Sequence, residues 1–92
     1  MGPPTLAATL YSRRDCPLCD RLAWDLEDLA LRPAPRVVVV DVDASPELRE
    51  RFGDWVPVLE VAGQLLVRGV WSRDELARRW TSLAAGLEED PC

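Results

Sequence analysis

The sequence predicts a single α/β domain with the element order βαβαββα. Three observations support this prediction: a strand-helix-strand pattern in the first half, two short strand patterns around a turn in the second half, and a C-terminal amphipathic helix. A chain of 92 residues can bury one modest hydrophobic core. We therefore expect one domain over residues 1–92, with its core over about residues 5–84 and a flexible tail over residues 85–92.

The first strand and the first helix are predicted from residue type and spacing. Residues 5–11 contain β-branched and aromatic side chains and run into a polar segment, as the end of a strand does. Pro17 suits the first position of a helix, and Pro33 prevents its continuation. Asp25 and the other charged residues between them are expected on the polar faces of this helix. Its apolar stripe is expected to contain Leu18, Leu22, Leu26 and Leu29.

A second strand, a short helix and a hairpin are predicted next. The run of valines in residues 36–42 is too short for a typical helix and apolar on both faces, as in a central strand of a covered parallel sheet. Ser45 and Gly53 are typical of the start and end of a short helix. Residues 58–61 and 65–68 flank a turn that contains glycine, so they predict a β-hairpin.

The last helix is predicted to begin at Ser72, because Glu75 three residues later completes a capping-box pattern. Its apolar stripe consists of Leu76, Trp80, Leu83 and Leu87. Trp24 in the first helix and Trp80 in the last are interpreted as packing residues.

Composition argues against two classes of function. The net charge is -5, and the eleven basic residues, all arginines, are scattered without the basic stripe that a nucleic acid requires. No stretch approaches the roughly eighteen consecutive apolar residues of a membrane span, and the N-terminus lacks the pattern of an export signal. We expect a cytoplasmic monomer with neither a nucleic-acid nor a membrane partner.

Cys16-Pro17-Leu18-Cys19 is the segment with the most specific chemistry. Two cysteines separated by two residues at a helix start can close a short disulfide ring, and only the first lies where unpaired backbone N–H groups point. The positive end of the helix stabilises a thiolate, so Cys16 is the predicted nucleophile and Cys19 the more buried resolving thiol. Attack of Cys16 on a substrate disulfide, followed by attack of Cys19 on the mixed disulfide and release of the substrate thiol, requires no metal, base or cofactor.

Other interpretations of the cysteines remain open. A structural zinc site needs four ligands, whereas the chain has three cysteines and no histidine, so no metal ligands are predicted within one chain. A metal ion or an iron–sulfur cluster held between two chains by Cys16 and Cys19 is the second candidate function. An interaction domain with incidental cysteines is the third. Cys92 is expected to be a free thiol on the tail, with a role as a third redox cysteine as the alternative.

Residues 11–19, Tyr-Ser-Arg-Arg-Asp-Cys-Pro-Leu-Cys, resemble the active-site segment of glutaredoxins, in which a strand ending in Tyr-x-Lys or Tyr-x-Arg precedes Cys-Pro-Tyr-Cys. Val56-Pro57 is similar to the Val-Pro that carries a cis proline facing the cysteines in glutaredoxins and thioredoxins. Residues 40–49 resemble the second strand and helix of small bacterial glutaredoxin-like proteins. The resemblance covers residues 5–83 and implies a thioredoxin-like fold, with a four-stranded mixed sheet in the order 2-1-3-4 and helices on both faces.

The resemblance also implies which residues bind the substrate. Val56 would offer its backbone to a substrate strand, and Pro57 would keep the chain kinked beside the nucleophile. Arg13 matches a basic residue three positions before the nucleophile, and Arg73 and Asp74 approximate the family's contacts at the last helix. The implied activity is reduction of protein disulfides or glutathione-mixed disulfides, with glutathione or a reductase as electron donor.

The sequence departs from the glutaredoxin pattern in three places that bear on glutathione binding. Leu18 replaces the usual Tyr, Trp55 replaces the Thr before Val-Pro, and residues 69–74 lack the family's Gly-Gly pair. Trp55 and Trp71 have two interpretations: an apolar wall near Cys16 that favours protein disulfides, or ordinary packing residues.

Overall fold

The structure, a computed structural model, describes residues 4–88. The elements follow the predicted order, with one additional short 3₁₀ segment, η1. Their bounds are β1 Thr5–Ser12, α1 Pro17–Asp28, β2 Ala34–Asp41, η1 Val42–Ala44, α2 Pro46–Phe52, β3 Val58–Val61, β4 Gln64–Arg68 and α3 Arg73–Glu88. No helix within this part of the chain is long and apolar enough to cross a membrane.

The four strands form one mixed sheet in the order β2-β1-β3-β4. β1 runs parallel to β2 and antiparallel to β3, and β3 pairs antiparallel with β4. The β3–β4 turn consists of Ala62 and Gly63, which both have positive φ, as a two-residue hairpin turn requires. The order implied by the glutaredoxin resemblance and the predicted hairpin are therefore confirmed.

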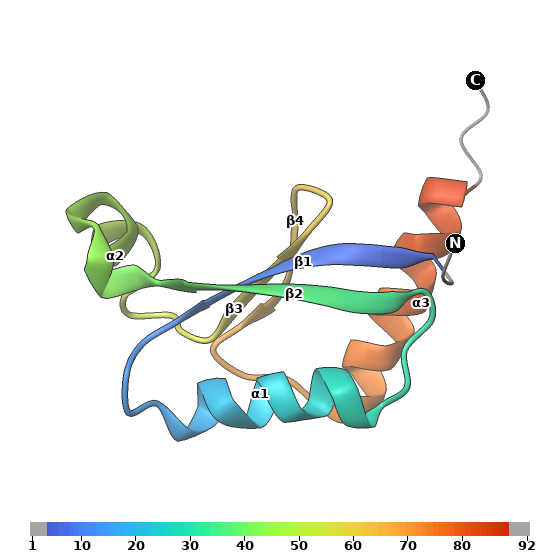
Figure 1. Cartoon of the computed structure of the whole chain (residues 1–92), viewed down its shortest axis with the longest axis horizontal. Coiled ribbons are helices and arrows are strands. Elements are labelled where there is room, and N and C mark those ends of the chain that lie inside the picture. The colour runs from blue at the N-terminus through green and yellow to red at the C-terminus, as the bar shows by residue number, and fades with distance from the viewer. Residues whose placement is uncertain (1–3, 89–92) are drawn as a thin grey trace.

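Helices α1 and α3 cover one face of the sheet and enclose the main core (Figure 1). Leu22 and Leu26 of α1 and Trp80 of α3 have no exposed surface. The Trp80 Nε1–H group donates a hydrogen bond of 2.8 Å to the carbonyl oxygen of Pro33, so this buried ring has no unpaired polar atom. The packing roles predicted for these residues are confirmed.

Helix α2 lies at one end of the sheet, apart from α1 and α3 (Figure 1). Phe52 of α2 packs against Tyr11 of β1 with ring centroids 4.4 Å apart, and both residues belong to a second core cluster with Val42 and Val58. Ser45 caps α2 through its hydroxyl, which accepts a hydrogen bond from the Leu48 N–H group. This small cluster anchors the chain where β1 and β2 lead into loops.

Strand β2 corrects one expectation. The valine-rich segment was expected to be a covered central strand, but β2 is an edge strand, paired only with β1. Val38 is 55% exposed and Val39 is 61% exposed. A β-branched run indicates a strand, but it does not show how many neighbours the strand has.

The set of buried side chains in α1 also differs from the prediction. Asp25 is only 1% exposed, although it was expected on a polar face of the helix. Leu18 and Trp24, which were expected to pack, are more than half exposed. The buried face of α1 is therefore centred on Leu22 and Leu26, with Cys19 of the first turn also buried.

Candidate functional site

The candidate site lies at one end of the sheet, where three loops join the ends of β1, β3 and β4. β1 ends at Ser12, just before the loop that leads to Cys16. Val58, the first residue of β3, pairs with Tyr11 of β1 and with Arg68, the last residue of β4. Three segments therefore meet at this end of the sheet: the one before Cys16, the one before Val58 and the one after Arg68.

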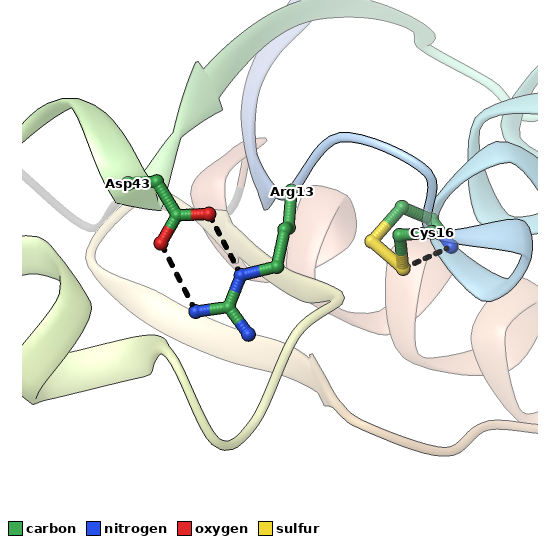
Figure 2. Close-up of a disulfide and its surroundings, with 4 residues drawn as sticks. Arg13, Cys16 and Asp43 are labelled. Atoms are coloured by element: carbon green, nitrogen blue, oxygen red, sulfur yellow. Dashed lines mark hydrogen bonds and ion pairs between the residues drawn. A yellow bond between two sulfur atoms is a disulfide. The ribbon is translucent and has the colours of Figure 1, made fainter.

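Cys16 and Cys19 form a disulfide at the start of α1 (Figure 2). Cys16 is the N-cap residue of α1, and its Sγ atom accepts a hydrogen bond of 3.2 Å from the backbone N–H group of Cys19. Cys16 is half-buried, whereas Cys19 is 3% exposed. Their Cα atoms are 5.3 Å apart, a usual separation for a disulfide. The structure thus brings the two predicted cysteines together and leaves Cys16 more accessible than Cys19.

The Val56–Pro57 peptide bond is cis, as the family resemblance implies. Pro57 is fully buried at the start of β3. Its carbonyl oxygen accepts a hydrogen bond of 2.9 Å from the N–H group of Gly69. Gly69 has a φ of 82°, a conformation that favours glycine, and it turns the chain out of β4 toward α3.

Arg13, predicted to bind substrate, makes a bidentate ion pair with Asp43 of η1 (Figure 2). Its Nε and Nη2 atoms lie 2.9 Å and 3.2 Å from the two carboxylate oxygens of Asp43. The hydrogen bond to Asp43 raises the pKa of Arg13 above its ordinary value. Arg13 therefore remains charged, and its charge is already paired within the protein.

Arg73, also predicted to bind substrate, joins the start of α3 to α1. Its Nη1 atom donates to Asp25 and its Nη2 atom lies 2.6 Å from Oδ2 of Asp28. The Trp71 Nε1–H group donates a second hydrogen bond to Asp25, at 2.9 Å. The hydrogen bond to Asp28, with the one to Asp25, raises the pKa of Arg73. Asp74 is exposed in the first turn of α3.

Sequence reasoning did not identify Asp25 as part of this site. Its position beside Leu26 borders the apolar stripe of α1, but the partners that allow its burial come from another element, 46 and 48 residues away. A buried carboxylate requires such hydrogen bonds, because desolvation of the charge is otherwise costly. The signal in the sequence is limited to the position of Asp25 at the edge of the stripe.

A groove of about 320 Å³ begins at Leu18, the residue that precedes Cys19, and we call it the groove beside the cysteines, although neither cysteine lines it. It is lined by Leu18, Arg21, Asp25, Gly69, Val70, Trp71 and Arg73. Leu18 is 53% exposed and Val70 is 82% exposed, so two large apolar side chains border the groove without being covered. Val70 was not singled out from the sequence, because a single valine in a loop has no distinctive pattern. A larger groove, about 580 Å³, lies between β4 and the second half of α3, away from the start of α1.

The two tryptophans proposed as an apolar wall have different environments. Trp71 is half-buried and lines the groove beside Leu18. Trp55 is 47% exposed, and the guanidinium of Arg68 stacks on its ring, 3.9 Å from the centroid. Only Trp71 lines this groove.

Within residues 4–88, no group of three or more Cys, Asp or Glu side chains is arranged to hold a metal ion. This finding concerns a site within one chain and does not test a cluster shared by two chains. Cys92, for which a free thiol or a third redox role was considered, lies outside the described residues.

The fold and the position of the cysteine pair are those of a glutaredoxin-like protein, and comparison with known families agrees. Residues 7–80 match the model of the Glutaredoxin-like domain (DUF836) family, so the chain belongs to this family. No match is found among curated proteins.

Two solved structures are similar to this chain. One is the structural genomics target protein XcR50 from X. campestris, with 30% identity and a TM-score of 0.69 over 83% of this chain and 96% of that chain. The other is the glutaredoxin from Brucella melitensis, with 20% identity and a TM-score of 0.53 over 98% of this chain and 91% of that chain. The second similarity supports the fold.

Proposed function

We propose that this protein is a dithiol thiol-disulfide oxidoreductase in which Cys16 is the nucleophile and Cys19 the resolving thiol. One observation carries the proposal: a half-buried cysteine caps the N-terminus of α1 and is within disulfide reach of a buried second cysteine. Membership of the glutaredoxin-like family supports the same chemistry.

The reaction starts from the reduced pair. The Cys16 thiolate attacks one sulfur of the substrate disulfide and forms a mixed disulfide, and the first substrate thiolate leaves. Cys19 then attacks Cys16 Sγ and releases the second substrate thiol, which leaves the Cys16–Cys19 disulfide. Two electrons pass to the substrate, and two protons accompany them. An external thiol or dithiol donor returns the pair to the reduced state.

The start of α1 stabilises the attacking thiolate. The Cys19 N–H group already points at Cys16 Sγ, and the first-turn N–H groups of a helix carry partial positive charge. Asp20 in the first turn opposes this effect by like-charge repulsion. Cys19 does not cap the helix and is buried, so it acts second.

Three of the five predicted substrate-binding residues, Val56, Pro57 and Asp74, remain part of the proposal. Val56 offers its backbone to the substrate beside Pro57, and Asp74 is available at the first turn of α3. Arg13 and Arg73 act mainly as structural ion pairs, because Asp43 and Asp25 occupy their guanidinium groups. Protein disulfides and glutathione-mixed disulfides are the substrate classes, and glutathione or a reductase is the donor. We place the reaction in the cytoplasm, where thiols are kept reduced.

Equilibration in thiol-disulfide buffers of graded potential tests the proposal. We expect a single two-electron transition between dithiol and Cys16–Cys19 disulfide, between about -270 and -200 mV, the span of thioredoxins and glutaredoxins. Mass spectrometry after alkylation measures the fraction of each form. Cysteines that stay unreactive, or that are held by stoichiometric iron or zinc in the purified protein, would contradict the proposal and favour the metal-binding alternative.

A further inference from the structure

We propose that the groove beside the cysteines binds a bulky apolar side chain next to the cysteine of an oxidised protein, so that protein disulfides with apolar neighbours react faster than glutathione disulfide. This inference rests on the proposed function and names its substrate class. It is carried by three features of the groove: its exposed apolar border, its balanced charge and its fixed walls.

The apolar border begins at the residue that separates Pro17 from Cys19 in the sequence. Leu18 lies between Cys16 and Cys19 in the sequence and lines the groove. Val70, in the loop after β4, also lines it and has 82% of its surface exposed. Uncovered side chains of this size beside a reactive cysteine gain free energy when a substrate covers them. A groove of about 320 Å³ has room for one large apolar side chain, although not for a folded segment.

The charges of the groove cancel within the protein. Its two arginines, Arg21 and Arg73, face the carboxylates of Asp25 and Asp28 at distances that form ion pairs. Glutathione has two carboxylates, which bind most strongly to cations that are not already paired. Of the two arginines in the loop before Cys16, Arg13 is paired with Asp43, and Arg14 does not line the groove. The groove therefore has no excess positive charge with which to favour glutathione over an uncharged apolar group.

The walls of the groove are held in place before any substrate arrives. Trp71 is fixed by its hydrogen bond to Asp25, and Arg73 by its contacts with Asp25 and Asp28. Walls that are already ordered lower the entropy cost of binding, so the free energy gained from the apolar contact can increase the reaction rate. The occupant must be attached to a disulfide that Cys16 reaches, which identifies it as a side chain close to the substrate cysteine.

The covalent step is the one already described. The Cys16 thiolate forms a disulfide with the sulfur of the substrate cysteine, the partner thiolate of that cysteine leaves, and the apolar neighbour lies in the groove during the attack. Cys19 then releases the reduced cysteine.

Two short uncharged peptides, identical except for leucine or serine next to a single cysteine and both disulfide-linked to the same small neutral thiol, serve as probes together with glutathione disulfide. We expect the reduced protein to react with the leucine peptide about tenfold faster than with the serine peptide and at least about tenfold faster than with glutathione disulfide. Val70→Ser should reduce the leucine preference to about twofold. Leu18→Ser is the second variant on the same groove.

Val39→Ser on β2 is the matched control, because Val39 is also exposed but lies outside the groove. This variant should keep the full leucine preference. Equal rates for the two peptides in the unaltered protein, or an unchanged preference in both Val70→Ser and Leu18→Ser, would overturn the inference while leaving the redox activity in place. No thiol exchange with any of the three substrates would overturn the proposed function itself.

Discussion

Replacing Cys16 with serine is expected to lower the rate of disulfide reduction by at least about a thousandfold. A hydroxyl at the N-cap of α1 still accepts the Cys19 N–H hydrogen bond, so the helix start should be preserved. The other cysteine within residues 4–88, Cys19, does not cap the helix and is only 3% exposed. The effect is therefore the loss of the attacking sulfur rather than of the fold. Turnover of a disulfide peptide with a dithiol donor measures it.

Cys92→Ser is the matched control for this prediction, because it also removes one thiol from the chain. Turnover should be unchanged, which would exclude the role of Cys92 as a third redox cysteine. A Cys16→Ser protein that retains a tenth or more of the activity would show that the nucleophile is elsewhere. Circular dichroism of both variants verifies that the fold persists.

The second large effect is expected at Asp25. Asp25→Ala should lower the free energy of unfolding by about 2–4 kcal/mol. The substitution leaves the Trp71 indole N–H without its partner and removes one of the two carboxylates that hold Arg73. The side chain of Asp25 is 2% exposed, so water does not replace these contacts easily. Urea denaturation followed by tryptophan fluorescence measures the change.

Asp28→Ala is the control, because Asp28 binds the same arginine but its side chain is 43% exposed. Exposed ion pairs contribute little, so this variant should lose no more than about 1 kcal/mol. Asp25→Asn should fall between the two, because an amide oxygen still accepts from Trp71. Equal losses for Asp25→Ala and Asp28→Ala would contradict the role of Asp25 as the buried link between α1 and α3.

Most of the fold follows from short-range patterns in the sequence. Hydrophobic periodicity, Pro17, Ser45 and Ser72 locate the three helices, because capping and helical spacing are local properties. The glycine-containing turn defines the hairpin for the same reason. The strand order was available only through the resemblance to glutaredoxins, since spacing alone does not decide which strands pair.

The errors concern long-range contacts. The valines of β2 look the same whether the strand is central or at the edge, and only the pairing with β1 decides that Val38 and Val39 are exposed. Asp25 looks like a surface charge until Trp71 and Arg73 approach it from a distant part of the chain. The groove beside the cysteines forms where the segment after β4 packs against α1, so the sequence alone did not show that Val70 lines it.

The cysteine pair was predictable because its chemistry is local. Two cysteines at fixed spacing on a helix start define which one is more accessible and which one is buried, and the structure has this asymmetry. The substrate-binding residues were less accessible to prediction. The partners of Arg13 and Arg73 are 30 or more residues away, and these partners decide whether a guanidinium is available to a substrate.

Trapping the mixed disulfide tests the central claim most directly. Reduced Cys19→Ser protein should form a stable one-to-one adduct with a cysteine-containing peptide supplied as a disulfide, and mass spectrometry of digested fragments should locate it on Cys16. The unaltered protein should release the reduced peptide and retain only the Cys16–Cys19 disulfide. An adduct on another residue, or no adduct with either protein, would contradict the assignment of Cys16 as nucleophile and Cys19 as resolving thiol.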